Sequence, residues 1–254
     1  MVLVSFSHQK RHRKALVAFF RALHLPLVET KARFKTDSCH PIEPNFSTIG
    51  VHRPNPSKIL ITCEHAANKL PPSVHWGPED NKKKLPFQHW AFDPGAKEFA
   101  QELAEQLDSP AVLSRFSRLF VDLNRPVASP TLIREYCDGQ RVELNTKITV
   151  AERYRRILQY YLPFHDEVEL VGQASKSRTA IAVHTFTEQY EGSQRDFEIG
   201  VLCSTGNQEL CLLITNALLA SGFSAKVNKP WSGKHGFMHT VDMYTYNGFP
   251  GHRQ

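Results

Sequence analysis

The run Lys58-Ile59-Leu60-Ile61-Thr62-Cys63-Glu64-His65 is the clearest structural signal in the sequence, because an apolar segment of strand length ends abruptly at two polar residues. Apolar and β-branched side chains in a short run that follows a proline, here Pro56, are typical of a buried strand. We therefore predict a strand at residues 58–63, with Glu64 and His65 directly beyond its carboxyl end.

Segments typical of helices and strands alternate through the rest of the chain. Asp93-Pro94 is typical of a helix N-cap followed by a first-turn proline, and apolar residues then recur at helical spacing over residues 96–107. Thr149 and Glu152 form a capping box before a second helix to about residue 171, and a third is predicted at 207–221. Further strands are predicted at 111–113, 119–123, 179–183, 197–203 and 224–227. This alternation predicts an α/β fold, a three-layer sandwich with a mixed, largely parallel sheet.

The net charge of +6 comes from the N-terminal segment. Residues 1–36 contain eight lysines and arginines and one acid, so they carry +7 and the remainder of the chain carries −1. A nucleic-acid partner is therefore not expected. We predict that residues 1–36 are a basic extension, either a targeting segment or an ordinary tail. The proline-rich residues 37–57 are predicted to be a linker, and residues 58–254 are predicted to form the domain.

Apolar runs and cysteines limit the cellular setting. No apolar run approaches the roughly 20 residues that cross a bilayer, so no membrane association is expected. Five cysteines without a CxxC pair argue against a disulfide framework and a thiolate zinc cluster, and Cys63 and Cys203 are expected to be buried and unreactive. These features favour a reducing compartment, cytoplasmic or mitochondrial, and not secretion.

Polar residues follow three of the predicted strands. Glu64 and His65 follow the first strand, Asn124-Arg125 follow residues 119–123, and His184 follows residues 179–183. Ligands of open α/β sheets bind beyond the carboxyl ends of the strands. Because neutral imidazoles are good zinc ligands, His65 and His184 are suited to supply two of the three protein ligands of a catalytic zinc site. Glu64 and Asp93 are the candidates for the third ligand.

Each of these residues also has an ordinary structural explanation. Asp93 by itself is a helix cap, and Asn124-Arg125 alone is more often a turn with a solvated arginine. A lone histidine at a strand end is more often structural than a ligand, and this chain has 13 histidines. The functional interpretation depends on the convergence of these residues on one edge of the predicted sheet.

Seven longer patterns follow one another along the chain: CEHAAN at 63–68 with Pro71, HWAFDPGA at 89–96, SRLFVDLNRP at 117–126, PFH at 163–165, VHTFT at 183–187, IGVL at 199–202 and NKPWSG at 228–233. Together they resemble, in order, the signatures of the N-formylglutamate amidohydrolase family over about residues 58–242. Many ordered motifs are far more specific than any single short pattern.

The resemblance implies a hydrolase that splits the amide of N-formyl-L-glutamate or a related N-acyl amino acid, in a fold similar to that of zinc carboxypeptidases. The expected partner is thus a small anionic substrate, and the expected cofactor is zinc. The resemblance implies that His65 and His184 are metal ligands and that Glu64 and Asp93 have the acid/base or third-ligand role. It also implies that Arg118, Asn124 and Arg125 bind the substrate carboxylates. His165 is expected to lie either near the substrate or in a structural hydrogen bond.

The sequence departs from the family's pattern in two places. Asn68 stands where carboxypeptidase-type sites place a glutamate, three residues after the first histidine, so the third ligand stays open. No carboxylate follows Asp242, where family members continue into a strand carrying a glutamate, so we expect a domain truncated at its C-terminus. The alternative function is a catalytically weak or inactive relative that binds a carboxylate metabolite or a protein partner. Residues 73–87 or 131–145 are expected to form the specificity loop.

Overall fold

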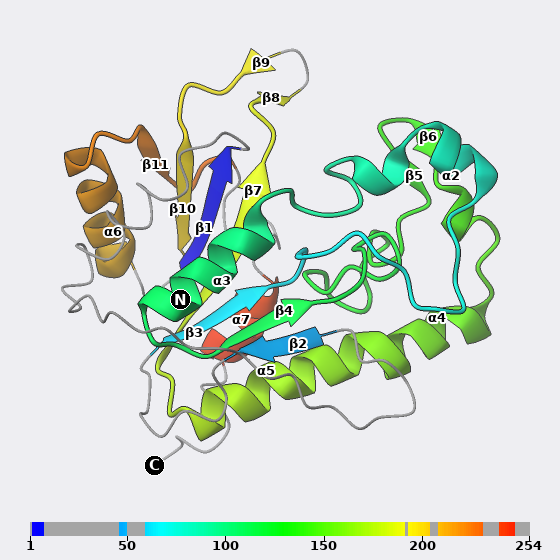
Figure 1. Cartoon of the computed structure of the whole chain (residues 1–254), viewed down its shortest axis with the longest axis horizontal. Helices are drawn as coiled ribbons and strands as arrows, with labels where there is room; N and C mark the ends of the chain where they lie inside the picture. The colour runs from blue at the N-terminus through cyan, green and yellow to red at the C-terminus, as the bar shows by residue number, and fades with distance from the viewer. Residues whose placement is uncertain are drawn as a thin grey trace.

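A seven-stranded sheet lies at the centre of the molecule (Figure 1), and the computed structural model describes residues 2–7, 46–49, 59–190, 193–203, 208–230 and 239–246. Four neighbouring strand pairs are parallel and two, β1–β10 and β2–β4, are antiparallel. The sheet is thus mixed and largely parallel, as the sequence predicted. In spatial order the strands are β11 (Ala225–Val227), β10 (Ile199–Cys203), β1 (Val2–Ser7), β7 (Thr179–Phe186), β3 (Ile59–Cys63), β4 (Ala111–Ser114) and β2 (Phe46–Ile49).

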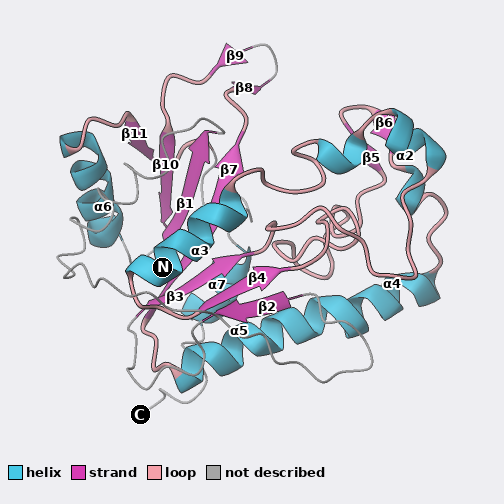
Figure 2. Ribbon diagram, viewed as in Figure 1, coloured by secondary structure: helices cyan, strands magenta, loops and turns pink. Residues whose placement is uncertain are grey.

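Helices cover both faces of this sheet (Figure 2). On one face, α3 (Ala96–Gln106) and α6 (Gln208–Ala220) pack against alternate strand residues such as Ile61. On the other face, α5 (Leu162–Ala174) and α7 (His239–Tyr246) pack against the intervening residues, among them Leu60. Because successive strand residues point to opposite faces, one strand contributes to both cores. The predicted three-layer arrangement is therefore confirmed.

The helix predicted from the capping box begins as α4 (Val150–Arg156), continues through the π-helical turn η3 (Ile157–Tyr161) and passes directly into α5. The Thr149 side chain accepts a hydrogen bond from the Glu152 amide at 3.1 Å, as a capping box requires. Pro163 lies at the start of α5, directly after this π-helical turn, so its missing amide hydrogen falls where the hydrogen-bond pattern of the helix already changes.

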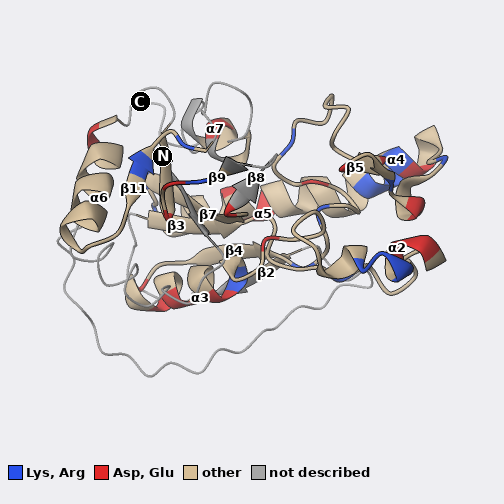
Figure 3. Ribbon diagram, turned by 90° about the horizontal axis from the view of Figure 1, so that it is seen from above, with Lys and Arg blue, Asp and Glu red and all other residues tan. Residues whose placement is uncertain are grey.

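Short elements and loops extend beyond the carboxyl ends of the central strands. They are α2 (Pro78–Lys82), η1 (Leu85–Phe87), β5 (Tyr136–Cys137), β6 (Gln140–Arg141), η2 (Glu143–Asn145), β8 (Gln189–Tyr190) and β9 (Ser193–Gln194). Basic and acidic segments lie side by side on α2 and α4 (Figure 3), in agreement with the nearly neutral charge of the chain beyond residue 36. None of the described helices is long and apolar enough to span a membrane.

Two sequence expectations differ from the described fold. Residues 119–123 form no strand: Phe120 N donates to Ser117 O within a turn, and Asp122 N donates to Leu132 O in the loop that follows. The apolar side chains of this segment are nevertheless buried. In addition, β1 pairs with β7 and β10, so residues 2–7 belong to the sheet and not to an extension that ends at residue 36. Residues 46–49 of the expected linker likewise form β2, which pairs with β4, and residues 8–45 and 50–57 lie outside the described residues.

The cysteines also differ from expectation. Cys203 at the end of β10 forms a disulfide with Cys211 in α6, and their Cα atoms are 6.2 Å apart. The helix that follows β10 packs against the same face of the sheet, which brings two cysteines eight positions apart into bonding distance. Cys63 is a buried free cysteine, as expected, and burial is the main cause that raises the pKa of its thiol.

Candidate active site

The parallel pairing of β3 with β7 places two of the predicted residues next to each other. Thr62 is in register with Ala182, so Glu64, two residues further along, lies level with His184. The backbone amide of Asp93 donates to His65 O at 2.9 Å, which fixes the Asp93 loop over the end of β3. The convergence expected from the sequence therefore occurs at the carboxyl edge of the sheet.

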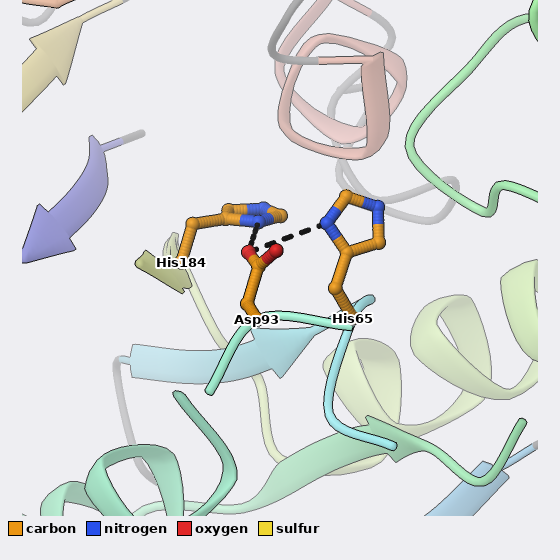
Figure 4. A group of neighbouring side chains, drawn as sticks. All are labelled: His65, Asp93 and His184. Carbon is orange, nitrogen blue, oxygen red and sulfur yellow. Dashed lines mark hydrogen bonds and ion pairs between the residues drawn. The ribbon is translucent and has the colours of Figure 1, made fainter. Parts of the chain in front are cut away.

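Asp93 lies between the two histidines and does not cap α3 (Figure 4). Its Oδ2 atom is 2.8 Å from Nδ1 of His184 and 3.3 Å from Nδ1 of His65. The N-cap of α3 is instead Gly95, whose φ of 82° favours glycine. His65, Asp93 and His184 are all buried, and their potential ligand atoms lie within 4.8 Å of one another.

The outer nitrogen of each histidine faces a second buried carboxylate. Nε2 of His65 is 2.8 Å from Oδ1 of Asp122, and Nε2 of His184 is 3.1 Å from Oε2 of Glu64. The Glu64 contact is not aligned as a hydrogen bond, so its Oε2 atom has no hydrogen-bond partner among the described residues, whereas its Oε1 atom accepts from Thr62. Glu64 therefore lies behind His184, and it does not line the cavity described below.

The donor set suits a divalent cation. Asp122 favours a hydrogen on Nε2 of His65, which leaves a lone pair on its Nδ1 atom, because neutral imidazole has one donor and one acceptor nitrogen. The Nδ1 atoms of both histidines converge on the same Asp93 oxygen, and in the tautomer that leaves them unprotonated the three atoms together suit a cation. Two histidine nitrogens and one carboxylate oxygen are a ligand combination used by catalytic zinc sites.

In the absence of a metal, a proton can supply the missing positive charge. Burial alone would lower the pKa of His184, but its contacts with Asp93 and Glu64 outweigh burial and raise the pKa to about 9. Burial likewise opposes ionisation of Asp122, yet Arg118 and His65 hold its pKa well below the usual range. The cluster is thus built around charged carboxylates that attract a cation.

A cavity of about 290 Å³ opens beside the three residues. Four arginines line it, and Asp93 is the only carboxylate among its described lining residues. Trp90 and Phe186 supply apolar walls. The arginines are Arg118, Arg125, Arg134 and Arg195. A small anion with an apolar portion is the kind of ligand that this lining favours.

The structure places the predicted substrate-binding residues in different environments. Arg118 lines the cavity, but its guanidinium donates twice to Asp122, at 2.8 and 3.1 Å, and lies 3.6 Å from Asp93. Asn124 lies 3.4 Å from Nε2 of His184 through its Nδ2 atom, and Arg125 lines the cavity beside it. These three residues come together at the site.

His165 is placed elsewhere. Its ring is buried, its Nε2 atom lies 3.1 Å from the Leu123 carbonyl, and it does not line the cavity. Tyr244 of α7 contacts its other nitrogen at 3.4 Å. Of the two roles left open by the sequence, this geometry corresponds to the structural hydrogen bond.

Three residues of the site were not assigned from the sequence. Asp122 had a detectable signal, since an aspartate within the apolar run FVDL is buried only when it is paired. Arg134 and Arg195 come from loops after β4 and β9, and no spacing pattern marks them. The expected specificity loop 131–145 does contain Arg134, whereas residues 73–87 contribute nothing to the described lining.

Comparisons with known proteins agree with this fold and identify a family. A solved structure of a gene product from Agrobacterium tumefaciens is 27% identical, with a TM-score of 0.67 over 80% of each chain. An N-formylglutamate amidohydrolase from Ralstonia eutropha JMP134 shares the fold at 19% identity, with a TM-score of 0.53 over 74% of this chain and 77% of that one. The chain matches none of the curated proteins with which it was compared. The family model for N-formylglutamate amidohydrolase matches residues 57–248, and the chain therefore belongs to that family.

Proposed function

We propose that this protein is a metal-dependent hydrolase that cleaves the amide of N-formyl-L-glutamate or a related N-acyl amino acid. The observation that carries the proposal is the convergence of His65, Asp93 and His184 at the wall of a cavity lined by arginines. Family membership supports amide hydrolysis, and the arginines support an anionic substrate.

In this proposal His65, Asp93 and His184 hold a divalent ion, for which zinc is the first candidate. Such an ion acts as a Lewis acid on a carbonyl group and activates water. Asp122 orients the His65 ring from behind through a hydrogen bond to Nε2, and the charge of Glu64 lies 3.1 Å from Nε2 of His184. Asp93 thus takes the third-ligand role, and Glu64 takes a positioning role instead of the acid/base role.

The substrate end of the site depends on Arg125 and its neighbours. The Arg125 guanidinium donates to the Asn124 carbonyl at 2.8 Å, which holds the side chain at the cavity wall. Asn124 is fixed in turn, because its Oδ1 atom accepts from the Thr240 amide at 3.2 Å. A guanidinium held in this way binds a carboxylate with two parallel hydrogen bonds, and we assign the α-carboxylate of the substrate to Arg125.

One observation favours the alternative function, a relative that binds its ligand with little or no turnover. Amide hydrolysis requires a group that moves a proton to the leaving amine. Among the described lining residues Asp93 is the only carboxylate, and the ligand role occupies it. A protein without another base would bind the substrate and hydrolyse it slowly.

Formate release from N-formyl-L-glutamate tests the proposal. The purified full chain is freed of metal with a chelator and then assayed with and without one equivalent of zinc. We expect zinc-dependent release that is lost in His184→Ala. The matched control is His75→Ala, an exposed histidine outside the cavity, which should keep wild-type activity.

The outcomes separate the two functions. Saturable binding of N-formyl-L-glutamate without its hydrolysis, together with no release of acid from a panel of N-formyl and N-acetyl amino acids, would support the binding relative and exclude the hydrolase. A chain that binds no metal under metal-replete conditions, as measured by elemental analysis, would contradict the assignment of the three ligands.

A further inference from the structure

The arginines of the cavity are not equivalent. The charge of Arg118 is neutralised within the protein, because its guanidinium lies 2.8 Å from Oδ2 of Asp122 and 3.6 Å from Oδ1 of Asp93. Arg134 differs, because the structure pairs it with no carboxylate among the described residues. Its guanidinium lies 5.6 Å from the ring centre of Trp90, and both side chains line the cavity. Arg134 is thus a half-buried cation at the cavity wall, in contact with an aromatic ring.

The backbone of Arg134 is anchored by a buried network. Its carbonyl accepts a hydrogen bond of 2.8 Å from the side-chain amide of Asn145, which is fully buried. The Oδ1 atom of Asn145 accepts from Arg156 at 2.8 Å, which fixes the orientation of the amide. Anchoring of this kind holds a binding side chain in place before the ligand arrives and reduces the entropy lost on binding.

Arg134 also lies close enough to Arg125 for their charges to interact. Burial is the main cause that lowers the pKa of Arg125, Asp122 opposes it, and the charges of Arg118 and Arg134 lower it further. Two guanidinium groups that repel each other across one cavity favour a ligand with two negative charges. A ligand with a single carboxylate would leave one of them without a counter-charge.

We propose that Arg134 is a specificity-determining residue that binds a second carboxylate of the ligand, so that the cavity selects dicarboxylates over monocarboxylates of the same size. The inference deepens the proposed function and rests on it for the identity of the reaction, because it assigns the side-chain carboxylate of an N-acyl acidic amino acid to Arg134. Trp90 orients the guanidinium, and Arg125 keeps the α-carboxylate.

The test compares two small ligands that differ in one charge. Glutarate has two carboxylates, and its monoamide glutaramate has the same size with one carboxylate. Calorimetric titration of the zinc-loaded full chain should show glutarate binding about tenfold to a hundredfold more tightly, the range expected for one hydrogen-bonded charge. Arg134→Gln should abolish this preference while glutaramate binding stays within about twofold of the wild type.

Two further variants make the assignment specific. Arg141→Gln removes an exposed arginine of β6 outside the cavity and should keep the full preference for glutarate. Arg195→Gln removes another arginine of the lining, and the preference should largely survive. The proposal is overturned if the wild type does not distinguish the two ligands, if Arg134→Gln retains the preference, or if Arg195→Gln alone abolishes it.

Ligand binding needs no turnover, so this test and the test of the reaction can fail separately. A preference for glutarate in a chain that releases no formate would support the Arg134 subsite and contradict the hydrolase. Conversely, equal kcat/KM for N-formyl-L-glutamate and N-formyl-L-glutamine would support the hydrolase and overturn the role of Arg134.

Discussion

Asp122→Asn should weaken metal binding without unfolding the protein. The Oδ1 atom of Asp122 accepts from Nε2 of His65 at 2.8 Å and from the Asn124 amide at 3.0 Å, while Oδ2 accepts twice from Arg118. The asparagine side chain has one oxygen and one NH2 group where aspartate has two oxygens. In either orientation its NH2 group faces hydrogen-bond donors, either His65 and the Asn124 amide or Arg118. The residue then loses its charge and at least one hydrogen bond.

The size of the effect follows from the role of carboxylates behind metal-bound histidines. Loss of such a partner typically costs tenfold to a hundredfold in metal affinity, or about 1.4 to 2.7 kcal/mol. We expect Asp122→Asn in the upper part of this range, because its contact with His65 is short. Glu64→Gln should lie in the lower part, because its contact with His184 is 3.1 Å and not aligned as a hydrogen bond.

The assay is a zinc titration of metal-free protein in competition with a chromophoric chelator, combined with urea unfolding of each variant. Asp80→Asn is the matched control, since this fully buried aspartate accepts from the Glu143 and Leu144 amides at 2.8 Å and does not line the cavity. It should destabilise the fold by about 1 to 3 kcal/mol and leave zinc affinity unchanged. The reasoning fails if folded Asp122→Asn binds zinc as tightly as the wild type, or if Asp80→Asn weakens zinc binding equally.

Three further predictions concern the fold. Replacing residues 2–7 by a Gly-Ser segment of equal length should cost about 5 kcal/mol or more and promote aggregation, measured by urea unfolding and light scattering, because β7 and β10 would each lose a partner strand. Burial, with the charge of His239, lowers the pKa of His165 to about 4. The unfolded chain therefore binds this proton first as the pH falls, and stability should drop by about 3 kcal/mol more in the wild type than in His165→Gln from about pH 6.5 to about pH 4, as pH-dependent unfolding will show. In Gly200→Ala the new methyl group would overlap the Lys229 carbonyl, so we expect a loss of about 1 to 3 kcal/mol in the same unfolding assay; wild-type stability would contradict this close approach.

The parts of the site that the sequence predicted correctly are those fixed by local patterns and sheet geometry. Apolar runs identified β3 and β7, and parallel strands place their carboxyl ends at the same edge of a sheet. His65 and His184 therefore had to lie near each other once these strands were recognised as neighbours. The same reasoning placed Glu64 near the site, although it could not distinguish a ligand from a residue behind a ligand.

The parts that the sequence could not predict depend on contacts between distant segments. Arg134 reaches the cavity because its loop is tied to Asn145 and, through Leu132, to Asp122, and none of these contacts has a spacing rule. Residues 119–123 have the composition of a strand, yet Phe120 N bonds within a turn to Ser117 O and Asp122 N bonds to the Leu132 carbonyl. Burial was therefore predictable for this segment, and its backbone pairing was not.

Asp93 illustrates why the local rule was wrong at the centre of the site. A helix cap is worth about 1 kcal/mol, and Gly95 can begin α3 in the left-handed conformation at little cost. A buried carboxylate between two histidines offers charge-assisted contacts, each worth more than a cap once a cation is present. The Asp93 side chain cannot satisfy both the helix and the histidines, so the larger interaction decides its direction. At this position the carboxylate is therefore better interpreted as a candidate ligand, and Gly95 begins the helix in its place.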